Sequence, residues 1–444
     1  MALIETVKNW RPKTPFYYGW LVLGVAAMGT YVATGAAQVV LGGIQSLIFE
    51  DMGWDRSTIA FAVTAGTWTS GFVSPFVGRL ADKHGPRGIM PIAALVVGIC
   101  YFALAGIQSV WQFYAAYIIA RAIANPILVG VVPRTVCVNF FQRRRNLALG
   151  FTSMARPFAG AINIQLISLI AQYFSWRAGY RYLGVLSLVM IVPLLLIMRR
   201  RPEDIGLRPD GDPPEDEDQN PAVGSGGARP RRPARARQFD WRASEAVMTT
   251  TFLFIVIAQI LEILTSGAIG FQIVPFLQDS GMSLALAAGA LSLSSMLGAL
   301  SNPVLGALAD RFNPRTMALA IVSVACVVTG LLLVEWPLPI RFVVLILWGT
   351  FSGGLGVLTS MMLAHYFGRT SYGTITGIIG PFQTGALGLG PTFGALLFNF
   401  TGGYSALFIF GVAAYVAAFV GILSVRTPKL PARASAGPNP GGEG

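Results

Sequence analysis

Long runs of apolar residues, separated by short polar segments, extend along most of the chain. A transmembrane helix needs about 20 consecutive, mostly apolar residues, and twelve segments of at least about 18 residues fit this pattern. We therefore expect an all-α membrane protein with twelve transmembrane helices. The predicted spans are 17–44, 59–80, 89–107, 111–139, 147–173, 180–198, 246–277, 284–308, 316–334, 341–366, 372–398 and 404–425.

The spans form two sets of six, on either side of one long polar segment. Residues 1–198 are predicted to form an N-terminal six-helix bundle, and residues 245–428 a C-terminal one. Residues 199–244 are rich in Pro, Gly, Arg and acidic side chains, so we expect a cytoplasmic linker that is largely disordered in the middle. We interpret it as a tether, with a regulatory or lipid-binding role as the alternative. Residues 429–444 are expected to be a disordered C-terminal tail.

The two halves repeat each other, and the matching positions are separated by the same number of residues throughout. Such parallel repeats of six helices are typical of transporters built from two bundles, and they favour a transporter over a receptor or a membrane enzyme. The fold class we expect is therefore two pseudo-symmetric six-helix bundles. The matching pairs are Gly42–Gly270, Asp51–Asp279, Gly53–Gly281, Pro75–Pro303, Gly78–Gly306, Asp82–Asp310 and Arg87–Arg315.

Composition and charge agree with a membrane location. Apolar residues make up 54% of the 444 residues and charged residues 12%, against about 25% charged in soluble domains. The net charge of +12 does not indicate nucleic-acid binding, because the basic residues lie between apolar spans. Segments predicted to lie inside carry 25 Lys and Arg, and those outside carry four. This bias places both termini in the cytoplasm, and we expect an integral protein of the plasma membrane, of the bacterial inner type.

Groups suited to catalysis are scarce. The chain has only two histidines, and its three cysteines lie in or at the ends of apolar runs, where they act as small hydrophobic residues. It shows no metal-ligand cluster, no nucleotide-binding loop and no nucleophile–base pair. We expect no enzyme activity, no metal and no cofactor.

Two polar loops, GRLADKHGPR at 78–87 and GALADRFNPR at 306–315, occupy equivalent positions in the two halves. Both resemble the cytoplasmic signature of the major facilitator superfamily. Glycine lets a neighbouring helix approach closely, and the aspartate can accept hydrogen bonds from a helix amino terminus or an arginine. We expect these loops to close the cytoplasmic side while the protein faces outward; ordinary charged turns are the alternative. The gate residues are Gly78, Asp82, Arg87, Gly306, Asp310 and Arg315.

Three further segments are FYYGW at 16–20, RRPEDIGLRPDG at 200–211 and YFGRTSYGTITG at 366–377. They look like bacterial members of the monocarboxylate-transporter-like branch, relatives of the oxalate:formate antiporters. The resemblance implies an arginine in the eighth helix that holds the substrate and, in oxalate carriers, a lysine in the eleventh. The spans 284–308 and 372–398 contain neither arginine nor lysine. The resemblance therefore does not identify the substrate of this protein.

Cationic side chains lie instead in the first half. Arg121 and Arg156 are each about ten residues from a helix end, which places them near the bilayer midplane. A charge there costs at least about 2.5–3.5 kcal/mol and needs a reason. We expect Arg121 and Arg156 to bind substrate, with Asn125 and Asn163 on the same helix faces, or else to hold helices together. Arg134 lies closer to the cytoplasmic end, so a structural role is favoured for it.

Glu262, in the seventh span, is the only acidic residue deep in any predicted span. Burial favours the neutral form of a carboxyl group, so a midplane glutamate can take up a proton and release it when water enters. We expect Glu262 to couple transport to protons; a neutral glutamate bonded to a neighbouring helix is the alternative.

These observations predict a secondary active transporter that moves a small organic anion, a carboxylate, by alternating access with proton coupling. The rival interpretation is an efflux antiporter for hydrophobic or cationic compounds, and a less favoured one is a non-transporting membrane sensor. The expected partners are a small-molecule substrate, a proton and membrane lipid, with no nucleic acid, and the protein is expected to work as a monomer.

The topology can be tested in a chain whose native cysteines have been replaced. The substitutions Ser225→Cys and Gly444→Cys should react with an impermeant thiol reagent only from the cytoplasmic side, because both positions lie in segments predicted to be inside. Asp55→Cys should react only from outside. Labelling at position 225 in intact cells would contradict the topology.

Overall fold

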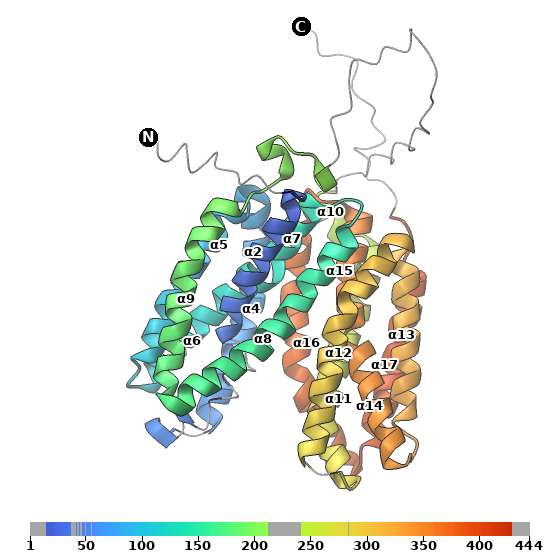
Figure 1. Cartoon of the computed structure of the whole chain (residues 1–444). Coiled ribbons are helices and arrows are strands. Elements are labelled where there is room, and N and C mark those ends of the chain that lie inside the picture. Colours follow the sequence, from blue (N-terminus) through green and yellow to red (C-terminus); the bar gives the residue numbers. More distant parts are fainter. Residues whose placement is uncertain are drawn as a thin grey trace, which may run out of the picture.

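The computed structural model describes residues 15–428, except 37–40, 42–43, 45–46, 49, 55, 212–240 and 283. Every regular element among these residues is helical (Figure 1). The prediction of an all-α protein is therefore confirmed. The predicted C-terminal tail and the middle of the predicted linker lie outside the described residues.

Helices of the first half gather on one side of the molecule (Figure 1). The fourth predicted span consists of three consecutive helical parts, an α-helix, a π-helical turn and a second α-helix. The elements are α2 (Tyr18–Ala33), η1 (Thr34–Ala36), α4 (Arg56–His84), α5 (Pro86–Ala105), α6 (Val110–Ala124), η2 (Asn125–Gly130), α7 (Val131–Phe140), α8 (Arg145–Tyr173) and α9 (Trp176–Ile197).

Helices of the second half lie on the other side, and the short connecting elements lie at one end of the bundle, at the top of the view (Figure 1). The connecting elements are η3 (Pro202–Ile205), η4 (Pro209–Gly211) and α10 (Ala243–Val247). The second half contains α11 (Thr250–Asp279), α12 (Leu284–Arg311), α13 (Pro314–Leu331), α14 (Leu338–Ser352), α15 (Gly354–Phe367), α16 (Tyr372–Thr401) and α17 (Ser405–Ser424).

Ten of the described helical segments are long and apolar enough to cross a membrane. The second and eleventh predicted spans, α4 and α16, have 29 and 30 residues but are not among the ten. These two helices pack closely against each other across the two halves, as α8 and α12 do. A helix whose partner is protein rather than lipid can carry more glycine and more polar side chains.

Small residues set the approach of α4 to α16. A Cβ atom at Gly78 would collide with the backbone of Gly373, and one at Gly377 would lie 2.6 Å from the carbonyl oxygen of Ser74. The contact begins at the end of the bundle where α2 starts and α17 stops, here called the gate end. Farther along, a Cβ at Gly388 would lie 2.8 Å from Nε1 of Trp68, near the middle of both helices. Toward the opposite end the ribbons of the two halves separate (Figure 1).

The sequence repeat reappears as matching contacts. Asp51 accepts a hydrogen bond from Nε1 of Trp176 at 3.0 Å, and its counterpart in the second half, Asp279, accepts one from the hydroxyl of Tyr404 at 2.7 Å. Both bonds lie at the end opposite the gate and stay within one half. Asp51 also pairs with Arg177, and hydrogen bonds from Arg177 and then Trp176 hold its pKa below the usual range. Two aspartates at equivalent positions of the repeat therefore do the same structural work.

Replacing Gly377 by leucine should weaken the contact between α4 and α16, because the added side chain would overlap the backbone at Ser74. Overpacking of this kind costs about 1–3 kcal/mol, enough to shift a two-state equilibrium about 5- to 150-fold. We expect faster labelling, from the gate end, of a reporter cysteine at Ser360, a buried position on α15.

The matched control is Gly385→Leu on the same helix, where an added Cβ would have no neighbour within 4 Å. It should leave the labelling rate unchanged. Equal rates in both variants would show that the α4–α16 contact does not hold the gate end closed.

Candidate functional site

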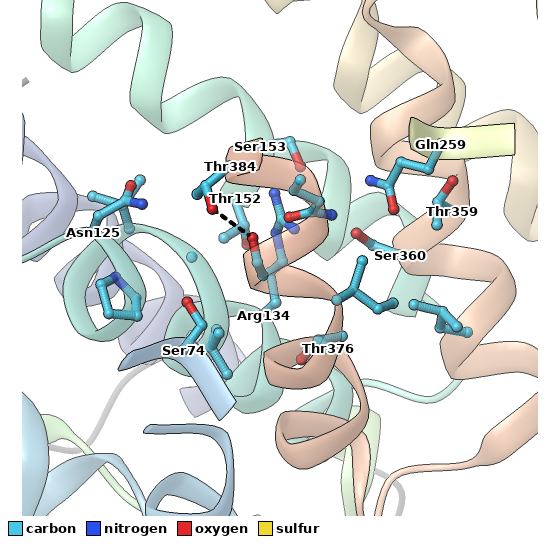
Figure 2. Close-up of a pocket in the computed structure, with 18 of the residues that line it drawn as sticks. Ser74, Asn125, Arg134, Thr152, Ser153, Gln259, Thr359, Ser360, Thr376 and Thr384 are labelled. Atoms are coloured by element: carbon cyan, nitrogen blue, oxygen red, sulfur yellow. Dashed lines mark hydrogen bonds between the residues drawn. The ribbon is translucent and has the colours of Figure 1, made fainter. Parts of the chain in front are cut away.

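A polar cavity of about 120 Å³ lies where the two halves meet. In Figure 2 the side chains of Ser74 and Asn125 lie on one side of it, and those of Gln259, Thr359 and Ser360 on the other. The first two belong to the first half and the last three to the second. None of the described residues that line the cavity is acidic. Its lining also includes Arg134, Thr152, Ser153, Arg156, Thr376, Gln383 and Thr384.

Two guanidinium groups face this cavity, Arg134 from α7 and Arg156 from α8. Arg156 is exposed although it lies midway along a helix, because it projects into open space inside the bundle. Neither side chain has a hydrogen-bond or ion-pair partner among the described residues. Ionisable side chains within membrane spans that face an internal cavity mark substrate or ion pathways. The cavity is therefore electrostatically prepared for an anion.

The π-helical turn η2 brings Asn125 and Arg134 to the cavity. Pro126 lacks an N–H group, so the regular hydrogen-bond ladder is interrupted, and the wider turn changes the direction of the side chains that follow. Asn125 donates from Nδ2 to Oγ of Ser70 at 2.7 Å, which ties the turn to α4. The sequence favours a structural role for Arg134 because this residue lies close to the cytoplasmic end of its span and because a straight-helix projection places it on a different face from Arg121. The sequence feature that could have indicated this irregular turn is Pro126 followed by Gly130 within one apolar span.

Two other predicted binding residues are occupied with helix packing. Arg121 donates from Nη1 to the carbonyl oxygen of Ala36 at 3.0 Å and from Nη2 to Thr67 at 3.5 Å. It shares a small side cavity with Asn125 and Arg156 but does not line the main one. Asn163 is fully buried and donates from Nδ2 to the carbonyl oxygen of Tyr31 and to Oγ1 of Thr34, joining α8 to the end of α2.

Glu262 lies on α11 outside the cavity lining. Gln259, three residues earlier on the same helix, does line the cavity, and its Oε1 has no partner there. Glu262 is 4% exposed and lies close enough to Tyr415 of α17 to interact with it electrostatically. The structure thus separates the predicted coupling residue from the predicted substrate residues.

Aspartates of the two signature loops join the halves at the gate end. Asp82, near the end of α4, accepts hydrogen bonds from the N–H groups of Gly373 and Thr374 at 3.0 and 2.7 Å, and from the Thr374 hydroxyl at 2.7 Å. Asp310, near the end of α12, accepts from the N–H groups of Asn146 and Leu147 at 3.2 and 3.1 Å. Each carboxylate therefore binds the amino terminus of a helix in the other half, where the helix dipole favours negative charge.

The arginines of the same loops brace each half internally. Arg87 donates from Nε to the carbonyl oxygen of Leu195 at 3.0 Å. Arg315 donates from Nη2 to the carbonyl oxygen of Leu423 at 2.5 Å, and Leu423 is the counterpart of Leu195 in the repeat. Both acceptors belong to the last turn of a helix, whose carbonyl groups lack intrahelical partners. The third and sixth spans of each half are thereby joined.

The first residues of the predicted linker are folded against the gate. Asp210 accepts hydrogen bonds from the N–H groups of Gln142 and Arg143 at 2.9 and 2.6 Å, just before α8 begins. Glu203 forms a 2.9 Å ion pair with Arg369, just before α16 begins. This segment, residues 199–211, therefore contacts the approach to both helices whose amino termini the gate aspartates bind.

Two helical halves around a polar cavity, with their ends joined by repeated loops, define a membrane transporter. The Major Facilitator Superfamily model matches residues 19–385 and 255–442, and the chain belongs to this superfamily. It is an integral membrane protein, and members of this family are not enzymes. The resemblance of the signature loops to this superfamily is thus confirmed.

Among curated relatives, the uncharacterized MFS-type transporter YcxA of Bacillus subtilis (strain 168) is 25% identical over 386 residues, covering 84% of this chain and 85% of that protein. Monocarboxylate transporter 2 of Homo sapiens is 21% identical over 424 residues, covering 91% and 85%. The resemblance to monocarboxylate transporters is confirmed at this low identity.

Solved structures show the same fold. The proton:xylose symporter XylE, bound to 6-bromo-6-deoxy-D-glucose, aligns with a TM-score of 0.65 at 14% identity, over 92% of this chain and 96% of that one. FucP, in the outward conformation, aligns with a TM-score of 0.66 at 12% identity, over 92% and 98%.

Replacing Asp82 by asparagine should open the gate end more often. The change keeps the size of the side chain but removes the charge that accepts three hydrogen bonds from α16, and bonds to a charged group contribute about 1.5–3 kcal/mol. We expect faster labelling of Ser360→Cys from the gate end and slower transport at normal expression.

Asp51→Asn is the matched control, because Asp51 accepts its bonds within the first half and at the opposite end. It should leave labelling from the gate end unchanged. If Asp82→Asn shows wild-type transport and labelling, the loop is an ordinary charged turn that does not hold the gate end closed.

Proposed function

We propose that this protein is a secondary active transporter that moves a small organic anion, a carboxylate, by alternating access. One observation carries the proposal: two unpaired guanidinium groups, Arg134 and Arg156, face a cavity whose described lining has no acidic side chain. A carboxylate would neutralise them and could accept the paired, parallel N–H bonds that a guanidinium offers.

The cavity walls differ in chemistry. The first half contributes both charges, whereas the second half contributes neutral amides and hydroxyls, among them Gln259, Gln383 and Ser360. An anion held by the arginines would turn its remaining polar atoms toward the second half. A ligand that contacts both walls favours the conformation in which the walls approach, and this differential binding drives the change of access.

A cation-exporting antiporter is disfavoured by the same charges. A lipophilic cation in this cavity would meet two guanidinium groups and no counter-charge among the described lining residues. The deep carboxylate that such a ligand would need, Glu262, is not part of this lining.

Coupling and orientation complete the proposal. Glu262 exchanges a coupling cation, for which the sequence alone predicts a proton, and the gate end faces the cytoplasm of a bacterial cell. The excess of Lys and Arg in the segments at that end supports this orientation. The transporter acts as a monomer in lipid, with the substrate and the coupling cation as its ligands and no role for nucleic acid.

The test is uptake and binding of labelled small carboxylates by purified protein in liposomes. Arg156→Lys and Arg134→Lys each keep the positive charge but lose the planar pair of donors. We expect each to weaken binding of the preferred anion by about tenfold or more, the effect of about 1.4 kcal/mol.

Arg121→Lys makes the same chemical change at a guanidinium that is already bonded to Ala36 and Thr67. It should affect affinity less and thermal stability more. Unchanged affinity in both cavity variants, or a preferred substrate that is a lipophilic cation exported from the cell, would overturn the proposal.

A further inference from the structure

A second group of buried polar side chains lies inside the second half, away from the cavity. Helix α17 packs against both α11 and α13 there. A Cβ atom at Gly411 of α17 would lie 3.3 Å from the methyl group of Thr265 on α11 and 3.0 Å from that of Thr329 on α13. One turn nearer the gate end on the same three helices are Glu262, Cys326 and Tyr415. Three helices thus place their polar side chains in two adjacent layers.

The hydroxyl groups of this cluster lack partners. Thr265 and Thr329 are fully buried and Tyr415 is 1% exposed, yet none of the three hydroxyl oxygens forms a hydrogen bond within the described part of the chain. Glu262, also buried, has no hydrogen-bond or ion-pair partner there. Leaving each such group unsatisfied costs about 1–3 kcal/mol, and clusters of this kind point to a ligand or water between the groups.

The charge of the cluster limits what the ligand can be. Glu262 is its single carboxylate, and the other titratable groups that face it are the phenol of Tyr415 and the thiol of Cys326, whose Sγ donates to the carbonyl oxygen of Val412. An anion would be repelled, and a divalent cation would leave a net charge in a low-dielectric interior. The donors available are oxygens, the atoms that bind hard cations.

We propose that Glu262, Thr265, Thr329 and Tyr415 form a binding site for a small monovalent metal cation, Na⁺. The ion would be held by the carboxylate and the three hydroxyl oxygens, with charge balance at the single carboxylate. Protons would compete for the same carboxylate, so Na⁺ would take the place of the proton.

The site is positioned to act on transport, an extension that rests on the proposed function. Gln259, one turn from Glu262 on α11, reaches the cavity. Helix α11 also packs along α16, the helix that the gate aspartate Asp82 holds. Binding of a cation between α11, α13 and α17 would therefore fix the helix that presents Gln259 to the substrate.

The experiment uses purified full-length protein without substrate. Its Tm is measured in NaCl and in an equal concentration of choline chloride, between pH 8 and pH 5. We expect Na⁺ to raise the Tm by about 5 °C at pH 8 and to have progressively less effect as the pH falls, because protons then occupy Glu262. Direct binding of ²²Na⁺ should show the same pH dependence.

Two variants locate the site. Glu262→Gln should abolish the Na⁺ response, and Thr329→Val, which removes one hydroxyl while keeping the shape, should weaken Na⁺ binding by about tenfold. Ser323→Ala on the same helix, whose hydroxyl donates to the carbonyl oxygen of Leu319, should respond like the wild type.

A Tm that rises at low pH with no Na⁺ effect at pH 8 would overturn the sodium site and leave Glu262 as a proton site. A Na⁺ response that persists in Glu262→Gln, or in Thr329→Val at full strength, would also overturn it. Because no substrate is present, the result is independent of whether the anion proposal stands.

Discussion

The contact between a carboxylate and the amino terminus of a helix in the opposite half is the interaction on which this architecture depends. Asp82 holds the start of α16 and Asp310 holds the start of α8, so the two halves are joined twice, at equivalent points. A charged acceptor on backbone N–H groups is strong enough to hold a closed end, yet each bond contributes only about 1.5–3 kcal/mol. Such a joint can open within a transport cycle.

Among the described residues, the interior charges that have no hydrogen-bond or ion-pair partner lie in two separate compartments. Arg134 and Arg156 face the cavity between the halves, whereas Glu262, on α11, lies within the second half and outside the cavity lining. Were they adjacent, the carboxylate would neutralise an arginine, and the cavity would lose its attraction for an anion. Their separation leaves the two arginines and the carboxylate available to ligands. Helix α11 connects the two compartments because it contributes Gln259 to one and Glu262 to the other.

The structural contacts are repeated in the two halves, whereas the charged residues of the interior are not. The gate aspartates, the bracing arginines and the aspartates at the opposite end all recur at equivalent positions of the second half and make matching contacts. The charged residues of the interior do not recur: the repeat places Thr384 at the position equivalent to Arg156, and Thr34 at the position equivalent to Glu262. A repeated scaffold can rock as two similar bodies, whereas a single ligand needs a site that is charged on one side.

The pattern of apolar and polar residues was enough to predict the helical class, the approximate spans, the repeat and the two loops that carry the paired aspartates. Lipid offers no hydrogen-bond partners, so a long apolar run must pair its own backbone groups and form a helix. A polar loop that recurs at a constant offset lies at equivalent positions in the two halves and has equivalent neighbours. The sequence also identified Arg156 and Glu262 as charges that need a reason. Which charged side chains find partners depends on how the helices pack. Arg134 reaches the cavity because a π-helical turn at Pro126 redirects the chain, and Arg121 is occupied by the carbonyl oxygen of Ala36. Thr265 and Thr329 come together at Gly411, and Tyr415 comes near Glu262, through the packing of three helices that are far apart in the chain. A helical projection treats each span as a straight and isolated rod, so it contains neither the bend in a helix nor the neighbour that a side chain will meet.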